Sequence, residues 1–151
     1  MSNNKEHFYE IDIKWKNGRT GTMSSPKLDD TLDVATPPEF PGGVEGVWSP
    51  EHLFTAAVSS CFMTSFTAVA EFSNFEFEDL KVHSSGKMSL DEGGKFVMSE
   101  IAVKAELTIH DESKEKKAIR LLKKAEQICL ITRSIISKVT LEPVVIVKKP
   151  A

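Results

Sequence analysis

The only two cysteines of this 151-residue sequence are Cys61 and Cys129. Two cysteines are too few for a secreted domain built on a disulfide framework and too few for a cysteine-rich zinc site. A thiol pair can still be a redox couple, because two thiols that come close together can be oxidised to a disulfide and reduced again by exchange. The alternative is that both side chains are small buried hydrophobes.

The segment that carries Cys61 has the pattern of a long helix. Ser49 can cap free backbone N–H groups, Pro50 suits the first helical position and Glu51 complements the positive helix end. We expect the helix to run to about Phe72, with Cys61 about three turns from its start. Apolar and small residues cover nearly every side of it, which predicts a central helix with no clearly solvent-facing side.

Cys129 lies at the end of a second amphipathic pattern, for which Ser113 is the expected cap. The apolar stripe has helical spacings of three and four residues and comprises Ala118, Leu121, Leu122, Ala125, Ile128 and Cys129. Its opposite face is basic, which is typical of a solvated surface, and a net charge of −3 does not favour a nucleic-acid partner. Because the two main helices of a small domain usually pack together, Cys61 and Cys129 can come within disulfide range.

The rest of the chain has strand patterns. Tyr9 to Trp15 alternate as a half-buried strand, and Asn17-Gly18 predicts a type I′ hairpin turn after which Arg19 opens the returning strand. Further strands are expected at 31–35, 78–90, 95–110 and 139–147. This order lacks the rhythm of a parallel fold and predicts an α+β class, with an antiparallel sheet packed on two main helices in one domain, 1–151.

A reactive thiolate in a central helix needs a cation from elsewhere in the chain. Burial raises the pKa of a thiol, and Cys61 is too far from the start of its helix to be helped there. Arg19 is a candidate, because its planar donor fork can bind a thiolate and a carboxylate together. The alternative for Arg19 is an ordinary exposed turn residue.

Location and metal binding can also be addressed from the sequence. The N-terminal residues have no apolar segment of a signal peptide, so we expect a cytoplasmic protein with reduced thiols. Residues 53–70 carry no charge but six hydroxyls, which favours a core helix over a membrane span. A metal site with His7, His52, His83 or His110 is disfavoured, since none has a short ligand spacing to a cysteine.

Several motifs together resemble the OsmC/Ohr family of thiol-dependent peroxidases, over nearly the whole chain. They are Asn17-Gly18-Arg19-Thr20-Gly21, Pro41-Gly42-Gly43, Ser49-Pro50-Glu51-His52-Leu53-Phe54, Cys61-Phe62 and Lys124-Ala125-Glu126-Gln127-Ile128-Cys129. An arginine in the Asn-Gly-Arg turn is similar to the organic hydroperoxide resistance (Ohr) branch. The other branch takes its arginine from the loop before the Pro-Glu helix, and residues 37–48 contain none.

The resemblance implies roles for four residues. Cys61 is the expected peroxidatic cysteine and Cys129 the resolving one, while Arg19 holds the thiolate and polarises the peroxide, and Glu51 orients Arg19. It also implies no bound cofactor, an external lipoyl-type dithiol as reductant, and an intertwined homodimer with interfacial sites. Glu51 and Cys61 lie about 15 Å apart along one straight helix. Arg19 must therefore span the two, or Glu51 must come from a partner chain.

The predicted activity is reduction of organic hydroperoxides to alcohols, with Phe54, Phe62 and Phe66 expected to line an apolar pocket. The expected partners are a lipophilic peroxide and a lipoylated protein or small dithiol, but neither nucleic acid nor membrane. The alternative function is a non-catalytic ligand-binding or redox-sensing protein of the same fold. Three departures from the family pattern bear on substrate preference and on the positioning of Cys129. Leu130 follows Cys129 where the family usually has proline, Val47-Trp48-Ser49 precedes Pro50 where Gly-Thr-Asn is usual, and Thr20 replaces an acidic residue.

Overall fold

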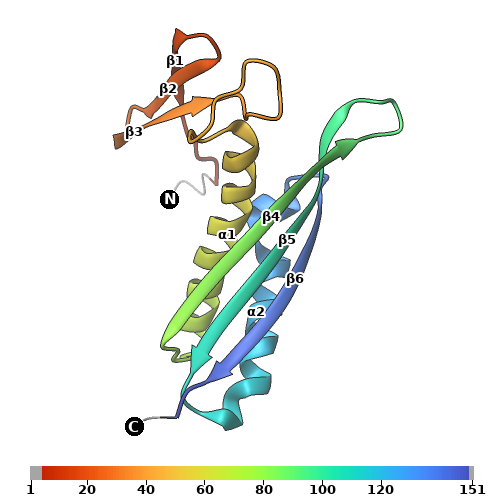
Figure 1. Cartoon of the computed structure of the whole chain (residues 1–151). Helices are drawn as coiled ribbons and strands as arrows, with labels where there is room; N and C mark the ends of the chain where they lie inside the picture. Colours follow the sequence, from red (N-terminus) through yellow and green to blue (C-terminus); the bar gives the residue numbers. More distant parts are fainter. Residues whose placement is uncertain (1–4, 150–151) are drawn as a thin grey trace. The chain divides into compact units, whose positions relative to one another are not determined.

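The computed structural model describes residues 5–149 and has the predicted α+β class. Its described residues form six strands in two three-stranded sheets, with two long helices (Figure 1). Contacts divide the chain after Leu53 into two compact units, the N-terminal unit and the C-terminal unit. One domain over 1–151 stays a prediction.

The N-terminal unit contains a three-stranded antiparallel meander of β1 (Asp12–Asn17), β2 (Thr20–Ser25) and β3 (Leu28–Ala35). Gly18 has φ +52° and Asn17 pairs with Thr20, so the two turn residues are Gly18 and Arg19. The predicted type I′ turn is wrong, because only the first central residue has positive φ, as in a type II′ turn. Arg19 therefore lies in the turn and does not open the strand.

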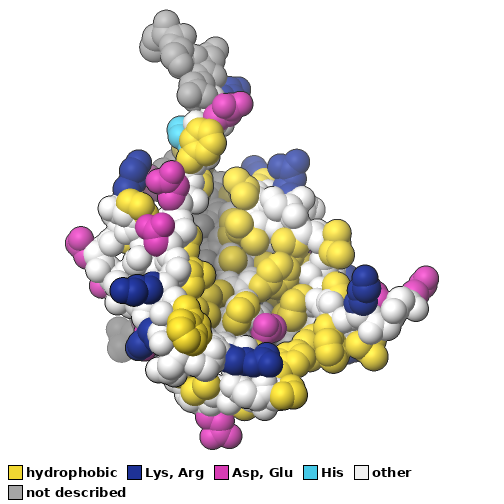
Figure 2. Space-filling view, turned by 90° about the horizontal axis from the view of Figure 1, so that it is seen from above, with side chains coloured by type: hydrophobic (Ala, Val, Ile, Leu, Met, Phe, Trp, Pro, Cys, Tyr) yellow, Lys and Arg dark blue, Asp and Glu magenta, His cyan; other side chains and the backbone are white. Residues whose placement is uncertain are grey.

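Strand β1 is exposed along its whole length, although its alternation predicted a half-buried strand. Trp15 is 70% exposed, and Ile13 is exposed as well. The alternation is present in the sequence, but within the N-terminal unit the described residues leave the apolar side chains of β1 exposed. Figure 2 shows that hydrophobic side chains also remain at other parts of the surface.

The C-terminal unit contains the second sheet, β4 (Asp79–Leu90), β5 (Phe96–Ile109) and β6 (Lys138–Val147). Strands β4 and β5 form the predicted antiparallel hairpin, whereas β6 runs parallel to β5. The expectation of a purely antiparallel sheet is wrong here. The connection between β5 and β6 contains the helix α2 (Glu115–Ile128), and such a crossover returns the chain in the same direction.

Helix α1 (Pro50–Phe72) begins and ends where the sequence predicted. In the C-terminal unit, α1 and α2 lie along the same face of the sheet (Figure 1). The core between them comprises Val58, Phe62, Phe66, Val69 and Ala70 of α1, Ala118, Leu121, Leu122 and Ala125 of α2, and Ile101, Val103, Ala105, Leu107 and Ile109 of β5. Alternate residues of β5 point into this core, which is why one face of the strand is entirely apolar.

One face of α1 is exposed in the single chain, contrary to the sequence expectation. It comprises Ser60, Met63, Thr64, Thr67 and Glu71. By length and composition α1 could span a membrane. Its large apolar side chains instead pack in the core of the C-terminal unit, as predicted for a core helix.

The start of the second helical region differs from the prediction. A 3-10 turn, Glu112–Lys114, precedes α2, and the carboxylate of Asp111 accepts hydrogen bonds from the backbone N–H and the hydroxyl of Ser113. Asp111 is thus the capping residue, in place of Ser113. The same hydrogen bonds from Ser113 lower the pKa of Asp111.

Candidate active site

The start of α1 is fixed by Ser49, which is fully buried. Its Oγ accepts a hydrogen bond from the backbone N–H of His52 at 3.1 Å and lies 2.6 Å from Nδ1 of the same histidine. This cap satisfies a backbone donor that has no partner within the helix. Glu51 therefore stands in the first turn of α1, as predicted.

Arg19 is supported by the loop that contains Pro41-Gly42-Gly43. A side chain at Gly42 would place its Cβ 3.0 Å from Arg19 Nε, so glycine permits a close approach of the arginine. Gly42 also has φ +78°, a conformation that glycine adopts without strain. Among the described residues, Arg19 forms no ion pair. Orientation of Arg19 by Glu51 stays a prediction.

The C-terminal unit brings Cys61 and Cys129 together, and both are free thiols. Cys61 comes from the middle of α1 and is half-buried, while Cys129 is fully buried at the end of α2. The two thiols lie close enough for each to affect the ionisation of the other. The prediction that Cys129 lies within the helix is wrong. Its backbone, with φ −59° and ψ 113°, ends α2 and precedes the short helix α3 (Leu130–Arg133).

The environment of Cys61 favours its thiolate. Burial raises the pKa of Cys61, but hydrogen bonds from the Ile131 N–H, the Cys129 thiol, the Ser65 hydroxyl and the Leu130 N–H outweigh this effect. The pKa of Cys61 is therefore below that of an ordinary thiol. A hydrogen bond donated to a thiolate stabilises the charged form and so lowers the pKa of the thiol.

The environment of Cys129 has the opposite result. Burial raises the pKa of Cys129, hydrogen bonds from Thr132 lower it, and the neighbouring Cys61 sulfur raises it again. The pKa of Cys129 is therefore above that of an ordinary thiol. The pair thus consists of Cys61, which ionises easily, and Cys129, which stays protonated beside it.

The aromatic residues expected to line a pocket belong to the core instead. Phe62 and Phe66 are buried, and Phe66 packs edge-on against Phe77 at a centroid distance of 5.3 Å. Both side chains belong to the core cluster of the C-terminal unit, and the apolar substrate pocket stays a prediction. The apolar side chains exposed beside Cys129 in the chain are Ile128 and Leu130, the latter 66% exposed.

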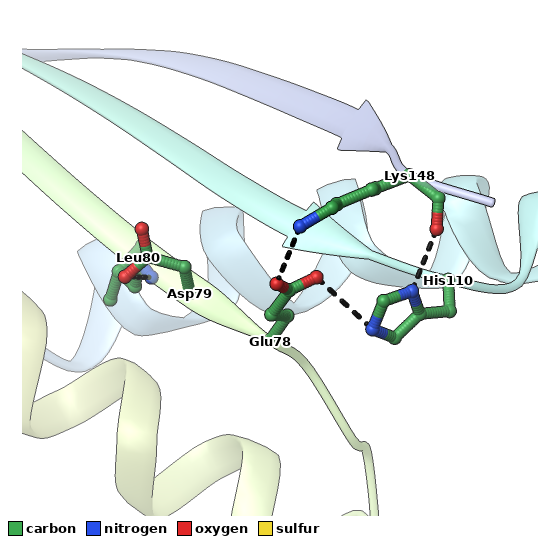
Figure 3. A network of polar contacts seen from close by, with 5 residues as sticks. All are labelled: Glu78, Asp79, Leu80, His110 and Lys148. Atoms are coloured by element: carbon green, nitrogen blue, oxygen red, sulfur yellow. Dashed lines mark hydrogen bonds and ion pairs between the residues drawn. The ribbon is translucent and has the colours of Figure 1, made fainter. Parts of the chain in front are cut away.

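A cavity of about 480 Å³ lies at the start of α2, about 20 Å along the helix from Cys129. Its lining comprises Phe75, Glu76, Phe77, Glu78, Ile109, His110, Asp111 and Lys114. Glu78 pairs there with Lys148 at 3.0 Å and with His110 at 3.1 Å (Figure 3). His110 Nδ1 also lies 2.7 Å from the Lys148 carbonyl oxygen, so this network ties the ends of the three strands together.

Metal binding finds no support in residues 5–149, where no group of three or more His, Cys, Asp or Glu side chains could hold an ion.

Sequence reasoning missed the donors that contact Cys61. Ser65 could have been found, since residues four apart share one face of a helix. The backbone N–H groups of Leu130 and Ile131 leave no trace in residue types.

The fold agrees with the comparisons to known proteins. The family model for OsmC-like proteins matches residues 43–143. The chain therefore belongs to the OsmC-like protein family.

Particular relatives extend the match beyond that region. The chain is 30% identical to the uncharacterized protein YmaD of Bacillus subtilis (strain 168), over 91% of this chain and 92% of that protein. Its fold is similar to an OsmC-like protein of unknown function from Vibrio cholerae, with a TM-score of 0.83, 20% identity and coverage of 92% and 100%. A Legionella pneumophila organic hydroperoxide resistance protein OsmC, described as a predicted redox protein, gives a TM-score of 0.70, 25% identity and coverage of 93% and 98%.

Proposed function

We propose that the protein is a cysteine-based peroxidase that reduces organic hydroperoxides, as in the Ohr branch of its family. The observation that carries this proposal is the contact between Cys61, whose pKa is lowered, and Cys129, whose pKa is raised. A nucleophile that ionises easily beside a protonated second thiol is the arrangement that a self-resolving thiol peroxidase needs. Membership of the OsmC-like family supports the same activity.

The proposed cycle has three steps. The Cys61 thiolate attacks the outer peroxide oxygen, the O–O bond breaks, and the alkoxide takes up a proton and leaves as an alcohol, so that Cys61 becomes a sulfenic acid. The Cys129 thiol then displaces water from the sulfenic acid and forms the Cys61–Cys129 disulfide. An external dithiol of lipoyl type reduces this disulfide by two exchanges and becomes a cyclic disulfide itself.

The partners belong to the proposal as well. Arg19 and Glu51 are the proposed charged residues that position the peroxide, in a homodimer whose sites lie at the interface. The exposed apolar side chains of Ile128 and Leu130 support a lipophilic peroxide over hydrogen peroxide. A lipoylated protein is the proposed reductant, and the cytoplasm the proposed location.

The test is consumption of cumene hydroperoxide with dihydrolipoamide as reductant. Cys61→Ser is expected to lose the activity, because an alcohol at this position does not replace the thiolate nucleophile. Ser60→Ala is the matched control, since the neighbouring hydroxyl bonds only to the Ala57 carbonyl at 3.3 Å, and it is expected to keep the activity. Peroxide consumption by Cys61→Ser at the parental rate would refute the proposal. A disulfide that forms without turnover would favour the redox-sensing alternative.

A further inference from the structure

The side of α2 that faces away from the core carries a cluster of positive charge, which we call the basic face. It comprises Lys116, Lys117, Arg120, Lys123 and Lys124. At about 100° per residue, these five positions fall within an arc of about 120° around the helix. The two carboxylates of α2, Glu115 and Glu126, lie outside this arc. No acidic residue of the helix therefore interrupts the basic face.

The charges of the basic face are not compensated by other elements. Among residues 5–149, none of its five side chains forms an ion pair with a carboxylate. Lys117 is half-buried, with its amine 5.9 Å from the ring centre of Phe75, and the other four side chains are exposed. The chain as a whole has a net charge of −3. The basic face is thus a local positive region on an acidic chain, which suits a short acidic segment better than a long polyanion.

The basic face ends beside the thiol pair. Lys124 and Ile128 are four residues apart and share one side of the helix, and Cys129 follows directly at the end of α2. Ile128 and Leu130 are exposed apolar side chains on either side of Cys129. A partner that binds along the basic face therefore reaches the surroundings of Cys129, where an apolar group can also be bound. All of these residues belong to the C-terminal unit.

We propose that the basic face docks an acidic segment of the protein that carries the reducing dithiol, while Ile128 and Leu130 contact the aliphatic arm of that dithiol. This inference rests on the proposed function, in which an external dithiol reduces the Cys61–Cys129 disulfide. Attraction between opposite charges raises the rate at which such a carrier meets the protein, and salt weakens it. A small neutral dithiol has no acidic segment and gains nothing from the basic face.

Two synthetic peptides of equal length serve as probes. Each has one central dihydrolipoyl-lysine, flanked by glutamates in the Glu peptide and by glutamines in the Gln peptide. The disulfide is formed with diamide, and mass spectrometry of quenched samples measures its rate of reduction by each peptide and by free dihydrolipoamide. We expect the Glu peptide to reduce the parent about tenfold faster than the Gln peptide at low ionic strength. This advantage is expected to vanish at about 1 M salt, where charges are screened within about 3 Å.

The test variant combines Arg120→Gln, Lys123→Gln and Lys124→Gln. Glutamine has nearly the helix propensity of lysine and arginine, so α2 is expected to form as in the parent. The variant is expected to lose most of the tenfold advantage of the Glu peptide. Its reduction by free dihydrolipoamide is expected to keep the parental rate, because the thiol pair itself is unchanged.

The matched control combines Lys14→Gln, Lys27→Gln and Lys95→Gln. These three lysines are exposed and lie outside α2, so the control loses the same net charge as the test variant. It is expected to keep the advantage of the Glu peptide. An equal loss in both combined variants, or equal rates of the parent with both peptides, would show that the proposal is wrong.

Binding of the Glu peptide to the reduced protein gives the same comparison without a redox step. The anisotropy of a fluorescein label on the peptide measures it, and weaker binding is expected for the test variant than for the control. This readout does not depend on peroxide reduction or on disulfide formation, so failure of the proposed function leaves it unaffected. Tighter binding of a labelled oligonucleotide than of the Glu peptide would assign the basic face to nucleic acid and overturn the proposal.

Discussion

Cys61 and Cys129 differ in their readiness to lose a proton, although both are cysteines in contact with one another. Burial raises the pKa of both thiols. The hydrogen bonds that Cys61 accepts outweigh this effect, whereas those that Cys129 accepts from Thr132 do not. In the proposed peroxidase cycle, this asymmetry makes Cys61 the thiol that reacts first.

The asymmetry predicts the order of labelling by a thiol reagent. Because the pKa of Cys61 is lowered and that of Cys129 is raised, alkylation of Cys61 is expected to begin at lower pH than alkylation of Cys129. Peptide mass spectrometry after brief exposure to iodoacetamide at increasing pH measures both. Labelling of Cys129 before Cys61 would contradict the assignment of nucleophile and resolving thiol.

Residue types alone identified the thiol pair but not its environment. Motif spacing indicated Cys61, Cys129, Arg19 and Glu51, and the structure brings the two cysteines together. The donors of Leu130 and Ile131 belong to the backbone, which every residue carries, so no pattern of side chains could indicate them. The close approach of Gly42 to Arg19 joins loops that are distant in sequence and was likewise not predictable.

At the scale of elements, α1 and β4 approach so closely that only glycine fits at one position. A Cβ at Gly86 of β4 would collide with the Thr55 hydroxyl oxygen of α1 and lie 2.8 Å from the Met98 methyl group. A hydrogen bond of 2.8 Å between Ser59 and Ser84 joins the same two elements. This packing holds the helix that carries Cys61 against the sheet.

Gly86→Ala is therefore expected to lower the free energy of unfolding by about 1 to 3 kcal/mol, because the Thr55 and Met98 side chains would have to leave their present rotamers. Urea denaturation of the reduced protein measures the loss. Adding Thr55→Ala is expected to restore part of it, because the colliding oxygen is removed. Gly93→Ala is the control, since its Cβ would meet nothing closer than Asp91 Oδ1 at 3.4 Å. Equal stability of Gly86→Ala and the parent would contradict the close contact.

Helices and strands could be predicted from the periodicity of apolar residues wherever the local sequence determines them. Helix α1 has the bounds that its cap and apolar run indicated, and β4 and β5 form the expected hairpin. The parallel pairing of β6 was not predictable from its pattern, because a half-buried strand alternates alike in either direction. The break at Cys129 was missed because no glycine or proline marks it.

For the whole molecule, the exposed apolar residues of β1 and α1 bear on assembly. Trp15 and Met63 are both exposed in the single chain. The exposed apolar side chains of β1 are typical of a surface that a partner covers, whereas Met63 stands among polar residues of α1. They are consistent with the homodimer that we propose.

A dimer is expected at twice the chain mass of 16.8 kDa. Light scattering coupled to size-exclusion chromatography, at the concentration of the activity assay, measures it. Trp15→Glu serves as the perturbed variant, since a charge on a covered face is expected to weaken association. A monomeric species with full peroxidase activity would rule out interfacial sites.

The place of the two cysteines in the chain also links redox state to heat resistance. Cys61 and Cys129 belong to different elements, and the whole β4–β5 hairpin and α2 lie between them in sequence. The disulfide would close a loop of about 70 residues, which in the chain-entropy model stabilises the folded state by about 4 kcal/mol. The oxidised protein is thus expected to melt at a higher temperature than the reduced one, so that a melting curve reports the fraction of the protein that carries the disulfide.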